Sequence, residues 1–393
     1  MIYNLAMKLS NFRTTIIGGC GHVGLPLGVI LASKGIKVKL LDINQNSVNQ
    51  VNNGKVPFYE PGIEELLVSA IDNGNIEATI NPEVIGETEY LIFVTGTPLN
   101  SDFNPQVDSV IQVINQYKSF FNSRHKIILR STVYPGTTLM VTRILSGINE
   151  NVYFCPERIA EGQAFKELQS LPQLIGSEKH QDVKVIEEYF SILGIRTLVT
   201  SYENAEIIKL LTNTWRYIKF GVVNEMWLLC QQLGINFNEL RELMISDYPR
   251  TQDLPKSGFA GGPCLIKDSR QLSHFFENKF MFANTALQIN NSIPIALANI
   301  IFNRFDTKEM TIGILGMAFK KDSDDTRSSL AYQLKEILET KTKQVLTSDP
   351  FIKTDKSLVD KNYLISQSEI IIIGAPHSEY ENLEFEKPVF NIW

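Results

Sequence analysis

The residues best suited to chemistry gather around one cysteine, Cys264. Three glycines and a proline precede it in the segment 257–268 (SGFAGGPCLIKD), and Lys267 and Asp268 follow within four residues. A glycine-rich loop can expose backbone N–H groups. A nearby ammonium favours the thiolate, the nucleophilic form of a thiol whose ordinary pKa is about 8.5. The spacing predicts a nucleophilic cysteine, and the alternative is a buried loop cysteine.

A second candidate site is the glycine pattern GCGHVG, in which Gly19, Gly21 and Gly24 match G-x-G-x-x-G. The pattern follows an apolar strand at 14–18, opens a helix, and precedes an acidic residue, Asp42, by 18 positions. The glycines permit a tight turn, close approach of a pyrophosphate, and helix packing on the sheet. The carboxylate would accept hydrogen bonds from ribose hydroxyls and repel a 2′-phosphate, so we expect NAD. The alternative is a glycine-rich turn in a flavodoxin-like fold.

Alternating strands and helices position these groups in the first 200 residues. Short apolar runs alternate with helical patterns, which predicts a parallel sheet covered by helices on both faces. The expected strands are 14–18, 37–42, 90–95, 126–131 and 151–155, and the expected first helix is 23–34.

A long helix follows. From Ile207, apolar residues recur at steps of three and four as far as Leu233, and Gly234 is a suitable terminator. A helix of roughly 30 residues spans about 45 Å. Lys209 and Asn213 share one face of this helix, roughly opposite the apolar stripe. Other positions on the helix are apolar too, which indicates burial on several sides, in part by a second subunit.

A second α/β segment begins near residue 311, so the chain is predicted to be α/β, with two Rossmann-like doubly wound domains joined by a long central helix and a helical middle domain. The expected strands are 311–315, 344–347 and 369–374. The predicted divisions are 1–200 for dinucleotide binding, 201–304 for the helical middle with the cysteine loop, and 305–393 for the second α/β domain.

Composition excludes several classes of protein. The 393 residues carry a formal charge of −6, with 44% hydrophobic and 20% charged residues, which is typical of a globular chain. The mild acidity argues against nucleic-acid or membrane-surface binding. No apolar run reaches the length of about 18 residues that spans a bilayer, and no secretory signal is visible. The four cysteines show no metal-site spacing and fit a reducing compartment, so a cytoplasmic location is expected.

Several motifs in order resemble the nucleotide-sugar 6-dehydrogenases, the family of UDP-glucose dehydrogenase, over nearly the whole chain. The resemblance implies oxidation of a C6 alcohol to a carboxylate with two NAD molecules, through a cysteine thiohemiacetal and a thioester. The matching blocks are GGCGHVGLPLG (18–28), EPGIEELL (60–67), FVTGTP (93–98), STVYPGTT (131–138), CPERIAEG (155–162), NAEIIKLLTNTWR (204–216), GFAGGPCLIKD (258–268), GMAFKKDSDDTRSS (316–329) and SDP (348–350).

The resemblance also implies roles for single residues. Cys264 matches the nucleophile, Glu157 the carboxylate that activates the hydrolytic water, and Glu161 a second carboxylate near the water or the nicotinamide. The remaining catalytic matches are Lys209 and Asn213, which stabilise the C6 oxygen, with Asp268 and Thr132. The implied cofactor contacts are Gly19, Gly21, His22, Val23, Gly24, Asp42, Thr97, Thr132, Lys267 and Arg327. The implied substrate contacts are Glu157, Arg158, Lys209, Asn213, Arg250, Gly258, Phe259, Phe319 and Lys320.

The identity of the sugar is divided between two branches of the family. Arg158 resembles the branch acting on UDP-N-acetylhexosamines, such as UDP-N-acetylmannosamine or UDP-N-acetylglucosamine, whereas Glu161 and the block around Cys264 resemble the UDP-glucose branch. We expect a UDP-N-acetylhexosamine and a homodimer. The alternatives are UDP-glucose, GDP-mannose, a two-electron β-hydroxyacid-type dehydrogenase, and a non-enzymatic NAD sensor or scaffold.

Overall fold

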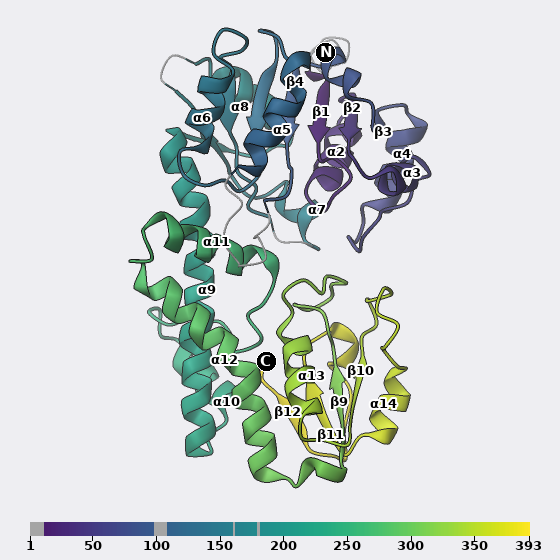
Figure 1. Ribbon diagram of the computed structural model, residues 1–393, viewed down its shortest axis with the longest axis vertical. Coiled ribbons are helices and arrows are strands. Elements are labelled where there is room, and N and C mark those ends of the chain that lie inside the picture. The colour runs from purple at the N-terminus through teal and green to yellow at the C-terminus, as the bar shows by residue number, and fades with distance from the viewer. Residues whose placement is uncertain (1–11, 98–107, 160–161, 179–180) are drawn as a thin grey trace. The chain divides into compact units, whose positions relative to one another are not determined.

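The computed structural model describes residues 12–97, 108–159, 162–178 and 181–393. The chain divides into two compact units, Met1–Leu210 and Leu211–Trp393, and the division falls inside a long helix, α9 (Tyr202–Leu233). Each unit contains a sheet covered by helices (Figure 1). Within the described ranges, no helix combines the length and the apolar content needed to cross a bilayer.

The sheet of the first unit runs β3-β2-β1-β4-β5-β6-β7-β8 through the described residues (Figure 1). Neighbouring strands are parallel except for β6 and β7. This is the doubly wound order of dinucleotide-binding sheets, with the reversal between β1 and β4. The strands are β1 (Thr14–Ile17), β2 (Val38–Leu41), β3 (Ile76–Thr79), β4 (Tyr90–Phe93), β5 (Lys126–Leu129), β6 (Val152–Phe154), β7 (Gln173–Gly176) and β8 (Thr197–Thr200).

Successive strand residues enter two separate hydrophobic cores, because side chains alternate between the faces of a sheet. Ile16 and Leu40 pack on one face, and Ile17 and Leu41 on the other. The first face is covered by α2 (Gly24–Ser33), α3 (Gln45–Asn52), α4 (Glu64–Asp72), α7 (Ala164–Glu167) and α8 (Lys184–Ser191). The second is covered by α5 (Ser109–Tyr117), α6 (Thr137–Ile144), the 3₁₀ turns η2 (Pro82–Glu87) and η3 (Lys118–Phe120), and the first turn of α9.

A buried carboxylate attaches the start of α9 to the first unit. Glu206 accepts hydrogen bonds from the backbone N–H groups of Gly136 (2.6 Å) and Thr138 (2.8 Å) and from the Thr138 hydroxyl (2.5 Å). These backbone groups open α6, so Glu206 satisfies donors that a helix start leaves unpaired. Burial raises the pKa of Glu206, although the hydrogen bonds it accepts act in the opposite direction.

The predicted long helix is confirmed, and it ends at Gly234, whose φ of 68° is the left-handed conformation of a helix terminator. In the second unit, Val223, Trp227 and Cys230 of α9 are buried in a hydrophobic core together with residues of α12. The other helices of this region are α10 (Phe237–Ile245), α11 (Pro263–Phe275) and α12 (Met281–Arg304).

The second sheet is parallel and runs β10-β9-β11-β12 through the described residues (Figure 1). Ile312 and Ile314 pack on one face with α12 and α13, and Leu315 and Ile371 on the other with α14. The predicted class, two Rossmann-like α/β folds joined by a long helix, is confirmed. The elements are β9 (Thr311–Leu315), β10 (Gln344–Ser348), β11 (Ile370–Ile373), β12 (Val389–Asn391), α13 (Leu330–Glu339), α14 (Lys361–Gln367), η4 (Thr307–Glu309) and η5 (Ser378–Tyr380).

Candidate active site

The glycine loop between β1 and α2 is shaped for close approach of a ligand. A Cβ atom on Gly19 would lie 2.8 Å from Leu40 Cα, and one on Gly24 would lie 2.7 Å from Gly18 O, so packing within the protein requires both glycines. A Cβ on Gly21 would meet only Gly18 O, at 3.8 Å. The protein itself therefore leaves space beside Gly21, as expected where a pyrophosphate approaches the backbone at a helix start.

Asp42 follows β2 directly and is bound to the same loop. Its carboxylate oxygens accept hydrogen bonds from the backbone N–H of Cys20 (2.9 Å) and of Asn44 (3.0 Å). His22 of the loop packs against Phe58, with ring centroids 4.0 Å apart and the rings tilted by 33°. An acidic side chain fixed beside the glycine turn is the arrangement that binds ribose hydroxyls, so these residues fit NAD, which accepts a hydride from the substrate when bound.

Strand register aligns the neighbouring strand ends. Ile17, Phe93, Leu129 and Phe154 lie opposite one another in β1, β4, β5 and β6. The residues that follow them therefore emerge at one edge of the sheet, where open α/β sheets bind ligands. Those residues lead to the glycine loop and to the predicted site residues Thr97, Thr132, Glu157 and Arg158. Glu161 lies outside the described residues.

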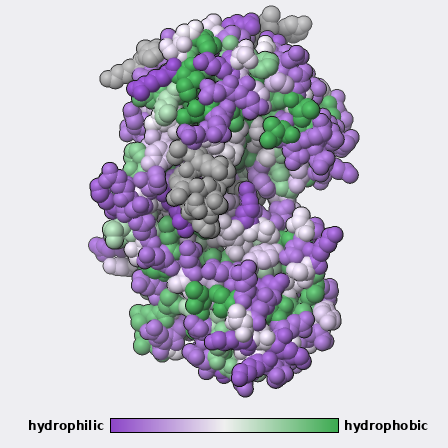
Figure 2. All heavy atoms as spheres, viewed as in Figure 1, coloured by the Kyte–Doolittle hydropathy of each residue, from purple (hydrophilic) through white to green (hydrophobic). Residues whose placement is uncertain are grey.

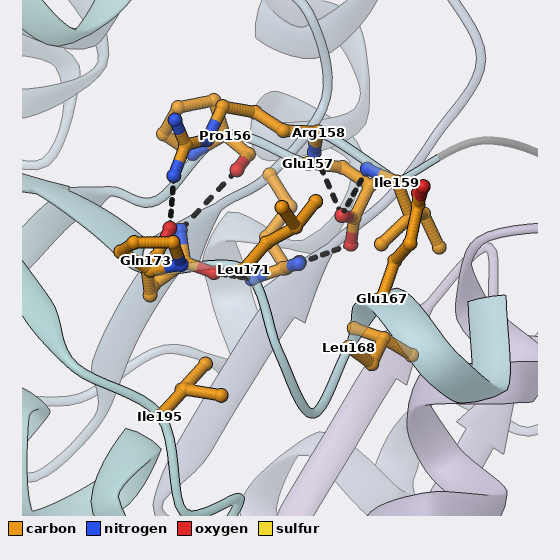
Figure 3. A pocket seen from close by; sticks show the side chains of 11 residues that line it. Pro156, Glu157, Arg158, Ile159, Glu167, Leu168, Leu171, Gln173 and Ile195 are labelled. Atoms are coloured by element: carbon orange, nitrogen blue, oxygen red, sulfur yellow. Dashed lines mark hydrogen bonds and ion pairs between the residues drawn. The ribbon is translucent and has the colours of Figure 1, made fainter. Parts of the chain in front are cut away.

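The carboxylate of Glu157 is held from three sides (Figure 3). It forms an ion pair with Arg130 and accepts hydrogen bonds from the backbone N–H of Arg158 (2.7 Å) and of Ile159 (3.0 Å). Burial alone would raise the pKa of Glu157. The Arg130 guanidinium and the two N–H donors outweigh burial and hold that pKa below its ordinary value. Glu157 is therefore a fixed, ionised group.

Further hydrogen bonds surround Glu157 in the pocket drawn in Figure 3. Arg130 also donates to Gln173 Oε1 (2.7 Å), and the Gln173 amide donates in turn to Pro156 O (3.2 Å). The guanidinium of Arg158 donates to Pro172 O, so in this structure the side chain predicted to meet the sugar is bound to the protein's own backbone.

Cys264 lies in the first turn of α11, directly after Pro263 at the helix start. Its side chain is exposed, whereas Cys20, Cys155 and Cys230 are buried. Lys267 and Asp268, three and four positions further on, lie on the same face of the helix, and their side chains form an ion pair at 3.1 Å. A helix N-terminus stabilises negative charge, which favours the thiolate.

The structure brings Asp268 together with another predicted residue from α9. Asn213 Nδ2 donates to Asp268 Oδ2 at 2.6 Å, and the side chains of both are buried. Lys209 lies one turn earlier on α9 and is also buried, with 8% of its surface exposed. The same helix also buries Glu206 and Asn224. A buried lysine is rare in proteins, so Lys209 points to a function other than solvation.

The second α/β fold contributes a segment that touches the cysteine loop. A Cβ on Gly262, which has φ +91°, would lie 2.5 Å from the Phe319 ring, so Phe319 packs directly on this glycine. Lys320 Nζ lies 5.3 Å from the centre of the Phe319 ring. Arg327 forms an ion pair with Asp325 at 2.6 Å. The segment bearing Phe319 and Lys320 thus adjoins the Cys264 loop.

Sequence reasoning missed several buried polar residues that hold these segments. Asp349, after β10, accepts hydrogen bonds from the backbone N–H of Met317 (2.7 Å) and Ala318 (3.0 Å) and pairs with His377 Nε2 (2.9 Å). Arg130 and Asn224 play comparable parts elsewhere. Asp349 lies in the matching block 348–350, but neither that match nor the polarity of these residues reveals their partners.

The fold and the glycine loop are those of a dinucleotide-binding protein that has a second parallel α/β fold. Models of the UDP-glucose/GDP-mannose dehydrogenase family match residues 12–193 (NAD binding domain), 203–292 (central domain) and 313–390 (UDP binding domain). The chain belongs to this family. It is an NAD-dependent dehydrogenase that oxidises a UDP-sugar at C6, as the resemblance implied.

Similar proteins and a similar solved structure are dehydrogenases that act on nucleotide sugars. The chain is 30% identical over 381 residues to a UDP-N-acetyl-D-mannosamine dehydrogenase of Pyrococcus horikoshii, covering 94% of this chain and 90% of the relative. It is 28% identical to a Campylobacter jejuni enzyme of the same name, covering 97% and 99%. The solved structure of UDP-D-ManNAc dehydrogenase from Pyrococcus horikoshii superposes with a TM-score of 0.89 at 27% identity, covering 97% of this chain and 99% of that one.

Proposed function

We propose that the protein oxidises the C6 alcohol of a UDP-N-acetylhexosamine to the uronic acid in two steps, through a covalent adduct on Cys264. The observation that carries the proposal is the exposed thiol in the first turn of α11, on the same helix face as the Lys267–Asp268 ion pair, with Asp268 bonded to Asn213. An aldehyde has no hydroxyl whose carbon can lose a second hydride. Addition of a thiolate restores such a carbon and retains the intermediate.

The other predicted residues have complementary roles. Lys209 and Asn213 are buried donors for the C6 oxygen, whose negative charge grows as a hydride leaves and as the thiolate adds. Asp268 moves a proton near the thiol, and Thr132 and Glu157 hold the water that cleaves the thioester. Arg250, Gly258, Phe259, Phe319 and Lys320 bind the nucleotide sugar.

Two observations favour an N-acetylated sugar. The relatives described above are named for UDP-N-acetyl-D-mannosamine, and Arg158 directly follows Glu157. An arginine can donate to an acetamido carbonyl. The Arg158 guanidinium already donates to Pro172 O through one nitrogen, and its other N–H groups are the donors proposed for the acetamido carbonyl. UDP-glucose is the alternative substrate.

The test is the number of NADH molecules formed for each sugar consumed, measured with a panel of UDP- and GDP-sugars and with product analysis by mass spectrometry. The four-electron reaction gives two NADH and a uronic acid, and we expect the highest kcat/KM with UDP-N-acetylmannosamine. One NADH per sugar indicates the two-electron dehydrogenase, and none indicates a binding protein. Cys264→Ala should abolish acid formation while NAD still binds, and a variant with the wild-type rate of acid formation excludes the cysteine mechanism.

We further propose a homodimer formed through α9. Five large apolar side chains on this helix are between 42% and 63% exposed, at spacings of four and seven residues. The face drawn in Figure 2 is mainly hydrophilic, with hydrophobic atoms in small separate groups. A regular apolar stripe on one helix is typical of a packing surface. The stripe comprises Leu211, Trp215, Val222, Leu229 and Leu233.

The three-part division at residues 200 and 304 and the cytoplasmic location remain proposals, the latter supported by reduced cysteines.

A further inference from the structure

Asn224 of α9 is fully buried, and its amide binds the backbone of one glycine in both directions. Nδ2 donates to Gly258 O at 2.9 Å, and Oδ1 accepts from Gly258 N at 3.0 Å. The side chain thus acts on Gly258 as a neighbouring strand would. Gly258 lies six positions before Cys264, in the loop that leads into α11.

A second buried amide fixes the orientation of the first. Asn290 of α12 has no exposed surface, and its Oδ1 accepts from Asn224 Nδ2 at 2.9 Å. Asn290 Nδ2 donates in turn to Tyr217 O on α9 at 3.4 Å. The Asn224 amide therefore has one hydrogen-bonding orientation, because a flipped amide would place like groups against Gly258 and Asn290.

Other contacts hold both ends of the loop that leads to Cys264. Ser257 Oγ donates to Ile392 O at 2.5 Å, and the Trp393 ring fills the space where a Cβ on Gly258 would lie. At the other end of the loop, Gly262 N donates to Ser328 O at 3.3 Å. Asn224 joins this loop to the long helix by hydrogen bonds.

We infer that Asn224 is a positioning residue for the Cys264 nucleophile, with Asn290 orienting its amide. The inference rests on the proposed function for what Cys264 does. After the first oxidation, the thiolate sulfur bonds to the aldehyde carbon, and the carbonyl electron pair moves to oxygen, which takes a proton. The second oxidation converts this thiohemiacetal to a thioester, each oxidation reducing one NAD. Water then cleaves the C–S bond, giving the acid and the thiol.

If the thiol is displaced, it should add to the aldehyde more slowly, and more of the aldehyde should dissociate from the enzyme before it is captured. The experiment compares wild type with Asn224→Leu, which keeps a similar volume and removes every hydrogen bond of the amide. Hydroxylamine traps released aldehyde as an oxime, and acid, oxime and NADH are quantified together. Wild type should give about two NADH per acid and little oxime. The variant should give about three or more, which corresponds to at least one aldehyde released for each acid.

This ratio does not depend on how much of the enzyme is folded, so a merely structural role leaves it at two. The matched control is Asn149→Leu in the first unit, a buried asparagine whose Nδ2 donates to Asn122 O (2.6 Å) and His125 O (2.8 Å). It should lower the thermal midpoint and keep two NADH per acid. Asn290→Leu leaves Gly258 bound to Asn224, and it should give an intermediate ratio.

A second readout needs no turnover. Because Cys264 is exposed and the other three cysteines are buried, the rate of alkylation by iodoacetamide reports on this thiol. Asn224→Leu should change the rate at least about threefold, and Asn149→Leu should not. If Asn224→Leu does not fold, Asn290→Leu decides the question. Two NADH per acid and wild-type alkylation in the folded variants overturn the inference. If wild type forms no acid, the proposed function fails, and alkylation alone decides the role of Asn224.

Discussion

At the scale of single residues, we expect Asp42 to determine whether the protein binds NAD or NADP. Asp42→Asn removes the charge while keeping an oxygen that can accept from Cys20 N or Asn44 N. A hydrogen bond to a charged group contributes about 1.5–3 kcal/mol, so the dissociation constant for NAD should rise about 10- to 100-fold. The dissociation constant for NADP should fall, because the carboxylate no longer repels the 2′-phosphate.

Isothermal titration calorimetry with both cofactors measures this change. An unaltered ratio of the two dissociation constants would show that Asp42 does not face the ribose. The thermal midpoint without cofactor serves as the control, since Asp42 also holds the glycine loop through Cys20 N.

A second residue-scale prediction concerns the ion pair between Arg130 and Glu157. Arg130 is 2% exposed, and Arg130→Met leaves the Glu157 carboxylate, whose side chain is 12% exposed, without its cation. The free energy of unfolding should fall by about 3–5 kcal/mol at pH 7, measured by urea denaturation. The double variant Arg130→Met with Glu157→Leu should recover most of that loss, because a buried ion pair can be replaced by apolar groups at little cost.

The pH dependence of the same pair has a defined sign. The folded-state pKa of Glu157 is depressed, so its contribution to stability is complete above the ordinary carboxyl pKa of about 4.3 and is lost as the pH falls through the lower, folded-state value. The stability difference between wild type and Glu157→Gln should therefore shrink below pH 4. A difference that stays constant down to pH 3 would mean that Arg130 does not hold this carboxylate ionised.

At the scale of elements, sequence periodicity predicted the long helix and most of the buried strands, because their apolar runs are continuous or regular. It missed β3, β8 and β12, and it also missed β7, whose four residues are all buried. β8 is four residues long and partly exposed, and β12 is three residues long. Such strands form because a neighbouring strand is already in place, and their own composition carries little signal.

The candidate site divides in the same way. The glycine loop, Asp42 and the Cys264 loop are local motifs and were predicted from their spacing. The hydrogen bonds that hold them join residues far apart in the chain: Arg130 and Glu157 are 27 positions apart, and Asn224 and Gly258 are 34. Such partners are chosen by the packing of whole elements, so no local pattern identifies them.

The exposed stripe of α9 carries a prediction at this scale. Replacing Trp215 and Leu229, which are 56% and 55% exposed, by glutamate should weaken self-association about 100-fold or more, since two charges per protomer would be buried in a dimer. Light scattering after size-exclusion chromatography measures the molecular mass. Ile80→Glu, at a site 52% exposed in the first unit, is the control and should leave the mass unchanged. A dimer that persists in the double variant contradicts a contact through α9.

At the scale of the whole molecule, one buried imidazole couples global stability to pH. His125 is 1% exposed, and burial, assisted by the nearby charge of Arg124, lowers its pKa from 6.5 to about 4. His125 in the unfolded chain therefore binds a proton near pH 6.5, whereas in the folded protein it binds one only near pH 4. Stability must rise with pH across this interval, because the unfolded state holds more protons there.

The size of this effect follows from the same pKa. At about 1.4 kcal/mol per pH unit, lowering the pH from 7 to 5 should cost about 2 kcal/mol through His125, in a range where ordinary carboxyl groups remain ionised. His125→Gln should remove that part of the slope in urea unfolding at pH 5, 6 and 7. Equal slopes for wild type and His125→Gln would mean that this imidazole is protonated without opening the fold. A reduced slope would show that the protein must unfold before His125 takes up a proton.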